Sequence, residues 1–180
     1  PVFGSHIHSA ALCGSCHTLI TNTVDLNGEP TGTEFVEQAV YHEWKNSSYP
    51  DNDVSCQDCH IPQISDTVKI STLPPWLAGR SPFGLHHLAG ANVFMQKILR
   101  ANIGELGITA ESVQLDSTIS RTLRMLQQHS VEISIFNQVR SVDKLSFSLL
   151  FDNLTGHKLP SGFPSRRMFI KILVVNAGLD

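Results

Sequence analysis

The sequence has little charge and no basic run. Charged residues make up 16% of its 180 positions, the formal net charge is −3, and the closest basic pair is Arg166-Arg167. Because nucleic-acid binding needs a clustered basic surface, we expect no nucleic-acid partner. No apolar stretch approaches the roughly 18 residues that a transmembrane helix needs, so we expect no membrane span in this chain. The first ten residues also lack the charged and apolar regions of a signal peptide.

Cysteine is scarce as well, and its placement is the most specific signal in the chain. The four cysteines all belong to two CxxCH motifs, CGSCH at residues 13–17 and CQDCH at residues 56–60. With this chain's cysteine and histidine frequencies, one such motif is expected by chance only about 0.004 times. Two motifs that use every cysteine therefore indicate a shared chemistry.

The CxxCH spacing is typical of covalent haem attachment. Two thiols three positions apart lie on the same side of one helical turn, so both can reach the two vinyl groups of one haem. The histidine that follows can bind the iron as its proximal ligand. We therefore predict two haem c groups. Their attachment residues are Cys13, Cys16, Cys56 and Cys59, and their proximal ligands are His17 and His60.

Three other interpretations of the cysteines compete with haem. A redox CxxC needs no histidine and usually lies in a βαβ unit. Disulfides could pair the four thiols but would not explain a histidine in each motif. A zinc site is chemically sensible, yet the 39 residues between Cys16 and Cys56 exceed the usual zinc-ribbon spacing. Because covalent haem attachment takes place outside the cytoplasmic membrane, we expect a periplasmic or extracellular location.

Histidine is abundant, with nine residues against three methionines. A low-spin electron-transfer haem needs a sixth ligand, which histidine or methionine supplies. Proline-rich loops around residues 73–85 and 154–164 would fix the direction of the histidines beside them. For His42 in a predicted helix and His129 at a helix end, packing or capping is an alternative role. The candidate distal ligands are His86, His87, His157, His8, His6 and His42.

The predicted fold is α+β, and its N-terminal part is predicted to be dominated by haem. Residues 1–87 form the dihaem c-type cytochrome region, mostly irregular, with short helices near residues 9–17 and 35–46. The polar, glycine-bearing residues 21–33 are predicted to be a loop. We expect few regular elements here because the haem itself would form much of the hydrophobic core.

Residues 88–129 are predicted to form a helical hairpin. Apolar residues recur with helical periodicity over residues 88–101, and again after Thr109, a suitable N-cap, through residue 128. This pair of helices would be antiparallel and would serve as a scaffold.

Residues 130–180 are predicted to begin a β-sandwich-like unit. Residues 131–136 and 145–151 alternate apolar and polar positions, and residues 168–175 are a β-prone apolar run. The turn sequence at 176–180 would then lead to a further strand. We therefore expect this unit to be incomplete and the chain to be part of a longer protein.

These residues resemble bacterial multihaem c-type cytochromes. In the pattern of that family, a CxxCHT segment is followed by an EQ…Y.EW..S motif and by CQDCHMP. Residues 12–62 contain each of these features, with Ile61 in place of the methionine. Residues 87–95 and 155–167 are similar to further segments of the family, so the likeness covers most of the chain.

The resemblance implies haem stacks that conduct electrons, commonly with bis-histidine ligation. It favours His86 or His87 and also His157 as distal ligands. The expected partners are redox proteins or further haem-bearing parts of the same protein, and no residue is expected to be catalytic. One alternative is a multihaem oxidoreductase that reduces a nitrogen or sulfur oxyanion at a haem with an open site. Another is a binding module whose β-region docks a partner.

Overall fold

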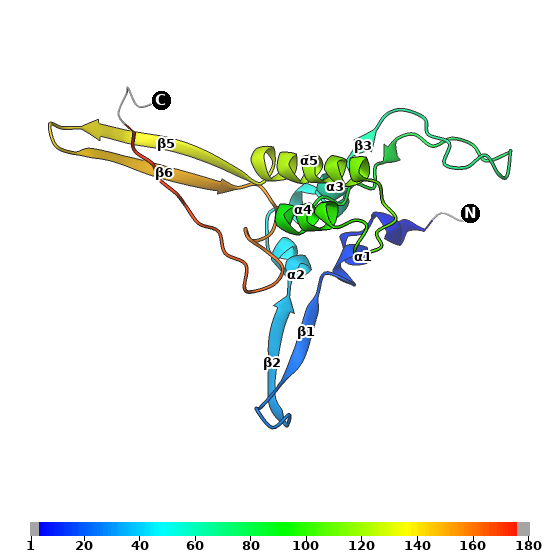
Figure 1. Cartoon of the computed structure of the whole chain (residues 1–180), viewed down its shortest axis with the longest axis horizontal. Coiled ribbons are helices and arrows are strands. Elements are labelled where there is room, and N and C mark those ends of the chain that lie inside the picture. Colours follow the sequence, from blue (N-terminus) through cyan, green and yellow to red (C-terminus); the bar gives the residue numbers. More distant parts are fainter. Residues whose placement is uncertain (1–3, 176–180) are drawn as a thin grey trace.

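A computed structural model describes residues 4–175 and shows a mixed α and β chain with an open, branched shape (Figure 1). Short helices gather at the centre. Two long β-hairpins and one loop project from this centre in different directions. The predicted mixture of helices and strands is confirmed, and the arrangement places both CxxCH motifs in the helical centre.

The helices of the described residues are short. Two 3₁₀ turns, η1 (Ser5–His8) and η2 (Pro50–Asn52), accompany the α-helices, which are α1 (Ala10–Gly14), α2 (Val40–Lys45), α3 (Cys56–His60), α4 (Val93–Ala101) and α5 (Ser112–Gln128).

The strands form three separate two-stranded antiparallel sheets across residues 4–175. They pair β1 (Leu19–Val24) with β2 (Pro30–Gln38), β3 (Gln63–Ile64) with β4 (Phe83–Gly84), and β5 (Val131–Arg140) with β6 (Leu145–Asn153).

The prediction of a loop over residues 21–33 is wrong, because these residues belong to the β1–β2 hairpin. Its turn is held by Asp25, whose carboxylate accepts hydrogen bonds from the backbone of Asn27 at 2.8 Å and Glu29 at 2.9 Å. Gly28 supplies the positive φ of 88° that the turn requires. The threonines, taken as loop residues, favour strands because they are branched at Cβ. The second strand also displaces the start of the predicted helix at 35–46, which begins only at Val40.

The predicted helical hairpin is present, with later starts than expected. α4 begins at Val93 because the Asn92 side chain accepts a hydrogen bond from the backbone of Met95 at 3.1 Å. The N-cap of α5 is Glu111, not Thr109, and its backbone N–H binds the Gln114 side chain at 2.8 Å.

Side chains join α4 to α5 at two levels. The Gln96 amide donates to the hydroxyl of Thr122 at 2.9 Å, and Thr122 is fully buried. Nearer the loop, the Arg100 guanidinium binds both carboxylate oxygens of Asp116, at 2.9 and 3.1 Å. The hairpin therefore has its own small contact surface.

Two of the three predicted C-terminal strands are confirmed, as β5 and β6. Residues 168–175 form no strand, so that prediction is wrong. A β-prone sequence becomes a strand only where a neighbouring strand satisfies its backbone, and none of the described strands pairs with it. The described part of the predicted β-sandwich is thus one two-stranded sheet. The turn predicted at 176–180 lies outside the described residues.

The described chain buries very little of its own apolar surface. Its buried hydrophobic residues are Ala10 and Ala89, and its buried polar residues are Thr122 and Ser130. The accessible surface is 14109 Å², whereas a folded monomer of this mass is expected to expose roughly 8,600 Å². Among residues 4–175 no helix is long and apolar enough to cross a membrane.

Candidate functional site

The first CxxCH motif is a single helical turn that continues from α1. Ser9 caps this helix by accepting a hydrogen bond from the backbone of Ala11 at 3.2 Å. Beyond α1, the backbone N–H of His17 donates to the carbonyl of Cys13 at 2.9 Å, which keeps the motif helical up to its histidine. The predicted placement of both thiols on one turn agrees with this geometry.

The second motif is itself the helix α3. Ser55 precedes it, and both its backbone N–H and its hydroxyl donate to one carboxylate oxygen of Asp58, each at 2.7 Å. This is a capping box, in which a serine and an acidic residue three positions later stabilise the helix start. Asp58 is one of the two variable positions of the motif, so the motif itself supplies the acidic residue of the capping box.

The two motifs lie against each other. Gln57, the other variable residue of the second motif, donates its amide to the carbonyls of Ile7 at 3.1 Å and Ser9 at 2.9 Å. Cys13 lies close enough to Cys56 to contribute to the pKa of the Cys56 thiol. Burial is the main cause that raises the pKa of Cys56 to about 11, and the nearby Cys13 thiol contributes to this rise. The two motifs therefore lie at one centre.

His60 is held in the orientation that a metal-binding histidine needs. Its Nδ1 lies 2.9 Å from the carbonyl of Ala89, one of the two buried hydrophobic residues. Burial is the main cause of a lowered pKa of His60, and the nearby rings of His157 and His17 lower it further. A neutral imidazole with its Nδ1 proton on a carbonyl leaves Nε2 free for a metal.

His17 is exposed and lies next to the base of the first hairpin. The amide nitrogen of Gln38, the last residue of β2, lies 3.2 Å from His17 Nδ1. The backbone N–H of Tyr41 reaches the carbonyl of His17 at 3.5 Å. Both contacts fix the histidine to the segment that joins β2 to α2.

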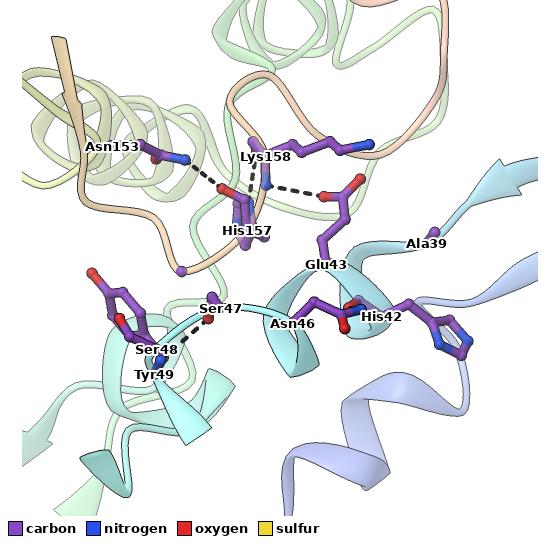
Figure 2. Close-up of a pocket in the computed structure, with 11 residues that line it drawn as sticks. Ala39, His42, Glu43, Asn46, Ser47, Ser48, Tyr49, Asn153, His157 and Lys158 are labelled. Atoms are coloured by element: carbon purple, nitrogen blue, oxygen red, sulfur yellow. Dashed lines mark hydrogen bonds between the residues drawn. The ribbon is translucent and has the colours of Figure 1, made fainter. Parts of the chain in front are cut away.

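His157 lies on a loop that α2 holds against the centre (Figure 2). The carboxylate of Glu43 accepts hydrogen bonds from the backbone of Lys158 at 3.1 Å and the hydroxyl of Ser161 at 2.6 Å. The ring Nδ1 of His157 lies 2.9 Å from the carbonyl of Lys158, so its Nε2 is also free for a ligand. The hydroxyl of Tyr49 holds the same loop by donating to the carbonyl of Leu154 at 2.7 Å.

A cavity of about 570 Å³ lies between α2 and this loop. His42 and Glu43 of α2 line it from one side, and His157 with Lys158 from the other. Two candidate distal histidines thus border this cavity, and the ring of His42 points away from that of His157 (Figure 2).

The remaining candidate histidines are not part of this group. The pKa of His87 is lowered mainly by partial burial of its ring. The charges of Arg121 and Arg124 on α5 lower it further. Three others are exposed: His6 and His8 in η1, and His86 in the segment after β4. Among the histidines, His17 and His157 thus contribute to the lowered pKa of His60, whereas these four do not.

Several residues that position the site were not singled out from the sequence. Glu43 and Tyr49 belong to the segment with the EW motif, which was noted only as part of a family pattern. Gln38 and Gln57 are uncharged amides whose partners lie far away in sequence, so no local signal could have found them. They are the residues that join the separate pieces of the site.

The donor set fits haem c better than the alternatives. None of the four cysteines forms a disulfide. Throughout residues 4–175, no three His, Cys, Asp or Glu side chains converge as a group that could hold a metal ion by themselves. A haem needs only two thiols and one or two imidazoles from the protein, and each motif offers these on one helical turn.

No protein-family model, curated protein or solved structure matches the chain. The function is therefore argued from the residues and their geometry.

Proposed function

We propose that this protein binds two haem c groups covalently and transfers electrons through them. The observation that carries the proposal is the contact between the two CxxCH segments, in which Gln57 of the second motif donates hydrogen bonds to the carbonyls of Ile7 and Ser9 just before the first. Two attachment sites with a shared border favour a function that needs two redox centres close together. We further propose that the protein is a multihaem c-type cytochrome that works outside the cytoplasmic membrane.

In this proposal the four cysteines form the thioether bonds, and His17 and His60 are the proximal ligands. A bound haem iron supplies reversible one-electron transfer. The carbonyl of Ala89 holds the Nδ1 proton of His60 and so directs Nε2 outward. At His17 the amide nitrogen of Gln38 lies 3.2 Å from Nδ1 and fixes the position of the ring at the base of the β1–β2 hairpin.

His157 is the best-supported distal ligand. It lies close enough to His60 to lower the pKa of that ring, and its Nδ1 is engaged by a backbone carbonyl. Glu43 and Tyr49 fix its loop, so its direction is set before any ligand binds. A second imidazole on the iron would close the open position that an oxyanion reductase needs, which favours electron transfer over catalysis.

The shortage of buried side chains also supports the proposal. Two large, flat, mostly apolar groups at the centre would cover surface that the described chain leaves exposed around α1, α2 and α3. We therefore propose that the two haems form much of the hydrophobic core of the N-terminal region.

The test is the visible spectrum of the purified holoprotein with and without carbon monoxide. Six-coordinate haem c predicts a sharp α-band on reduction and no spectral change when carbon monoxide is added. A prompt change at one haem would instead indicate an open site and favour the oxyanion-reductase alternative. A protein without a Soret band would contradict haem binding altogether.

A further inference from the structure

The β1–β2 hairpin is an arm that projects away from the helical centre (Figure 1). It starts two residues after His17 and ends at Gln38, whose amide contacts the ring of His17. Both strands of the arm are therefore anchored at a proposed proximal ligand. A partner that held this arm would lie beside the first haem-attachment site.

One face of the arm already satisfies its own polar groups. The hydroxyls of Thr23 and Thr33 are hydrogen-bonded at 2.6 Å, and that of Thr31 joins both of them. At the base of the same face, Thr21 donates to the Glu37 carboxylate at 2.8 Å. This ladder stiffens the hairpin and keeps its faces in a fixed orientation.

The opposite face is apolar and exposed. Side chains alternate along a strand, and the register pairs Ile20 with Val36 and Asn22 with Glu34 on this face. Val24 follows an irregularity in the register and pairs with Pro30 near the tip. The exposed fractions of Ile20, Val36 and Val24 are 45%, 47% and 59%. Ile20 and Val36 beside the Glu34 carboxylate, with Val24 nearer the tip, make an exposed apolar surface on the arm in the described chain.

The charge of the arm has one sign. Residues 1–44 contain no lysine or arginine, while the arm carries Asp25, Glu29, Glu34 and Glu37. The hydrogen bonds from the backbone of Glu29 and Asn27 lower the pKa of Asp25 and keep its carboxylate ionised at the tip. The apolar face is thus bordered only by negative charge.

We infer that this arm is the docking surface for an electron-exchanging protein whose own surface has an apolar centre surrounded by lysine and arginine. The inference rests on the proposed electron transfer. An apolar centre with a charged rim is the usual anatomy of a protein interface, and opposite charge selects the partner and speeds the encounter. A small hairpin suits electron-transfer complexes, which bury little area because they must separate after each transfer. A second copy of this chain fits poorly, since two identical acidic arms would repel each other.

The test is stopped-flow electron exchange between the reduced holoprotein and a small lysine-rich cytochrome c of the mitochondrial type. The variant Asp25→Asn/Glu29→Gln/Glu34→Gln removes charge at exposed positions, and asparagine can replace aspartate in the turn. The matched control is Glu132→Gln/Asp143→Asn/Asp152→Asn, which removes three exposed carboxylates from the β5–β6 hairpin. A further variant, Val36→Thr, makes the apolar face less hydrophobic and leaves the charge of the arm unchanged.

We expect the hairpin variant to slow the second-order rate about tenfold at low salt and to flatten its salt dependence. The control variant should stay within about twofold, because only charges near the docking site steer the encounter. Val36→Thr should weaken the complex without changing the salt slope. Equal effects of the two charge variants, or no effect of either, would overturn the inference. An intact haem spectrum in the same samples would then leave the proposed function standing, whereas loss of that spectrum in the wild type would remove both.

Discussion

The amide of Gln57 donates a hydrogen bond to the carbonyl of Ser9 at 2.9 Å, although 48 positions separate the two residues in the sequence. With a second hydrogen bond to the carbonyl of Ile7, Gln57 ties the start of α3 to the chain just before α1, and Cys13 contributes to the raised pKa of Cys56. The relationship links the two CxxCH motifs more closely than their sequence separation suggests. It also makes the chemistry of one thiol depend on the other.

In the haem-free chain, Cys13→Ala should lower the pKa of Cys56 from about 11 while leaving it above its ordinary value. Burial, the leading cause, remains in the variant, whereas the contribution of the Cys13 thiol is lost. The pH dependence of Cys56 alkylation, followed by peptide mass mapping, measures this, and the rate near pH 9 should rise several-fold. Cys16→Ala is the control. A Cys56 profile that shifts equally in both variants would show that Cys13 does not contribute specifically to the pKa of Cys56.

His157→Ala should open the sixth position of one haem in the holoprotein. Carbon monoxide should then bind one haem per chain, as seen by reduced-state absorption. His157→Met should restore a sixth ligand and raise the midpoint potential, since methionine ligation raises haem potentials. His129→Ala is the matched control, because His129 lies at the C-terminal end of α5. If His157→Ala stays inert to carbon monoxide, another residue is the distal ligand.

Glu43→Ala should release the loop that carries His157. Lys158 and Ser161 would lose a shared carboxylate acceptor, and hydrogen bonds to charged groups contribute about 1.5–3 kcal/mol each at most. Hydrogen exchange of residues 154–161 should accelerate, and part of the protein should become reactive to carbon monoxide. Glu34→Ala, on the exposed hairpin, should change neither quantity. Unchanged exchange in Glu43→Ala would refute this role of the carboxylate.

Thr122→Val should lower the free energy of unfolding by about 1–2 kcal/mol, measured by urea denaturation of the holoprotein. The Gln96 amide nitrogen would lose its buried partner, and the amide oxygen of the same side chain has no hydrogen-bond partner already. Ser120→Ala, at an exposed position on the same helix, should have a smaller effect. An equal loss in both variants would mean that the contact between α4 and α5 contributes little.

The sequence predicted best where one local pattern determines the structure. CxxCH residues 13–17 and 56–60 form the expected helical turns, and the alternating residues 131–136 and 145–151 form β5 and β6. Each of these depends on neighbours that are close along the chain. Their conformation therefore follows from the local sequence.

The predictions that failed depended on distant or competing partners. Residues 21–33 have turn chemistry at their centre, and the flanking threonines become strands only because the two halves pair. Residues 168–175 have the propensity of a strand without a neighbouring strand in the described chain. The contacts of Gln38, Glu43 and Gln57 bridge segments far apart in sequence, so composition and periodicity carry no trace of them.

The measurement that tests the central proposal most directly is the intact mass of the purified protein under denaturing conditions. Covalent attachment predicts a mass equal to the chain plus two haems. The Cys13→Ala/Cys16→Ala variant and the Cys56→Ala/Cys59→Ala variant should each carry one haem. The bare chain mass with four alkylatable thiols, in a protein produced with its haem-attachment machinery, would contradict the proposal.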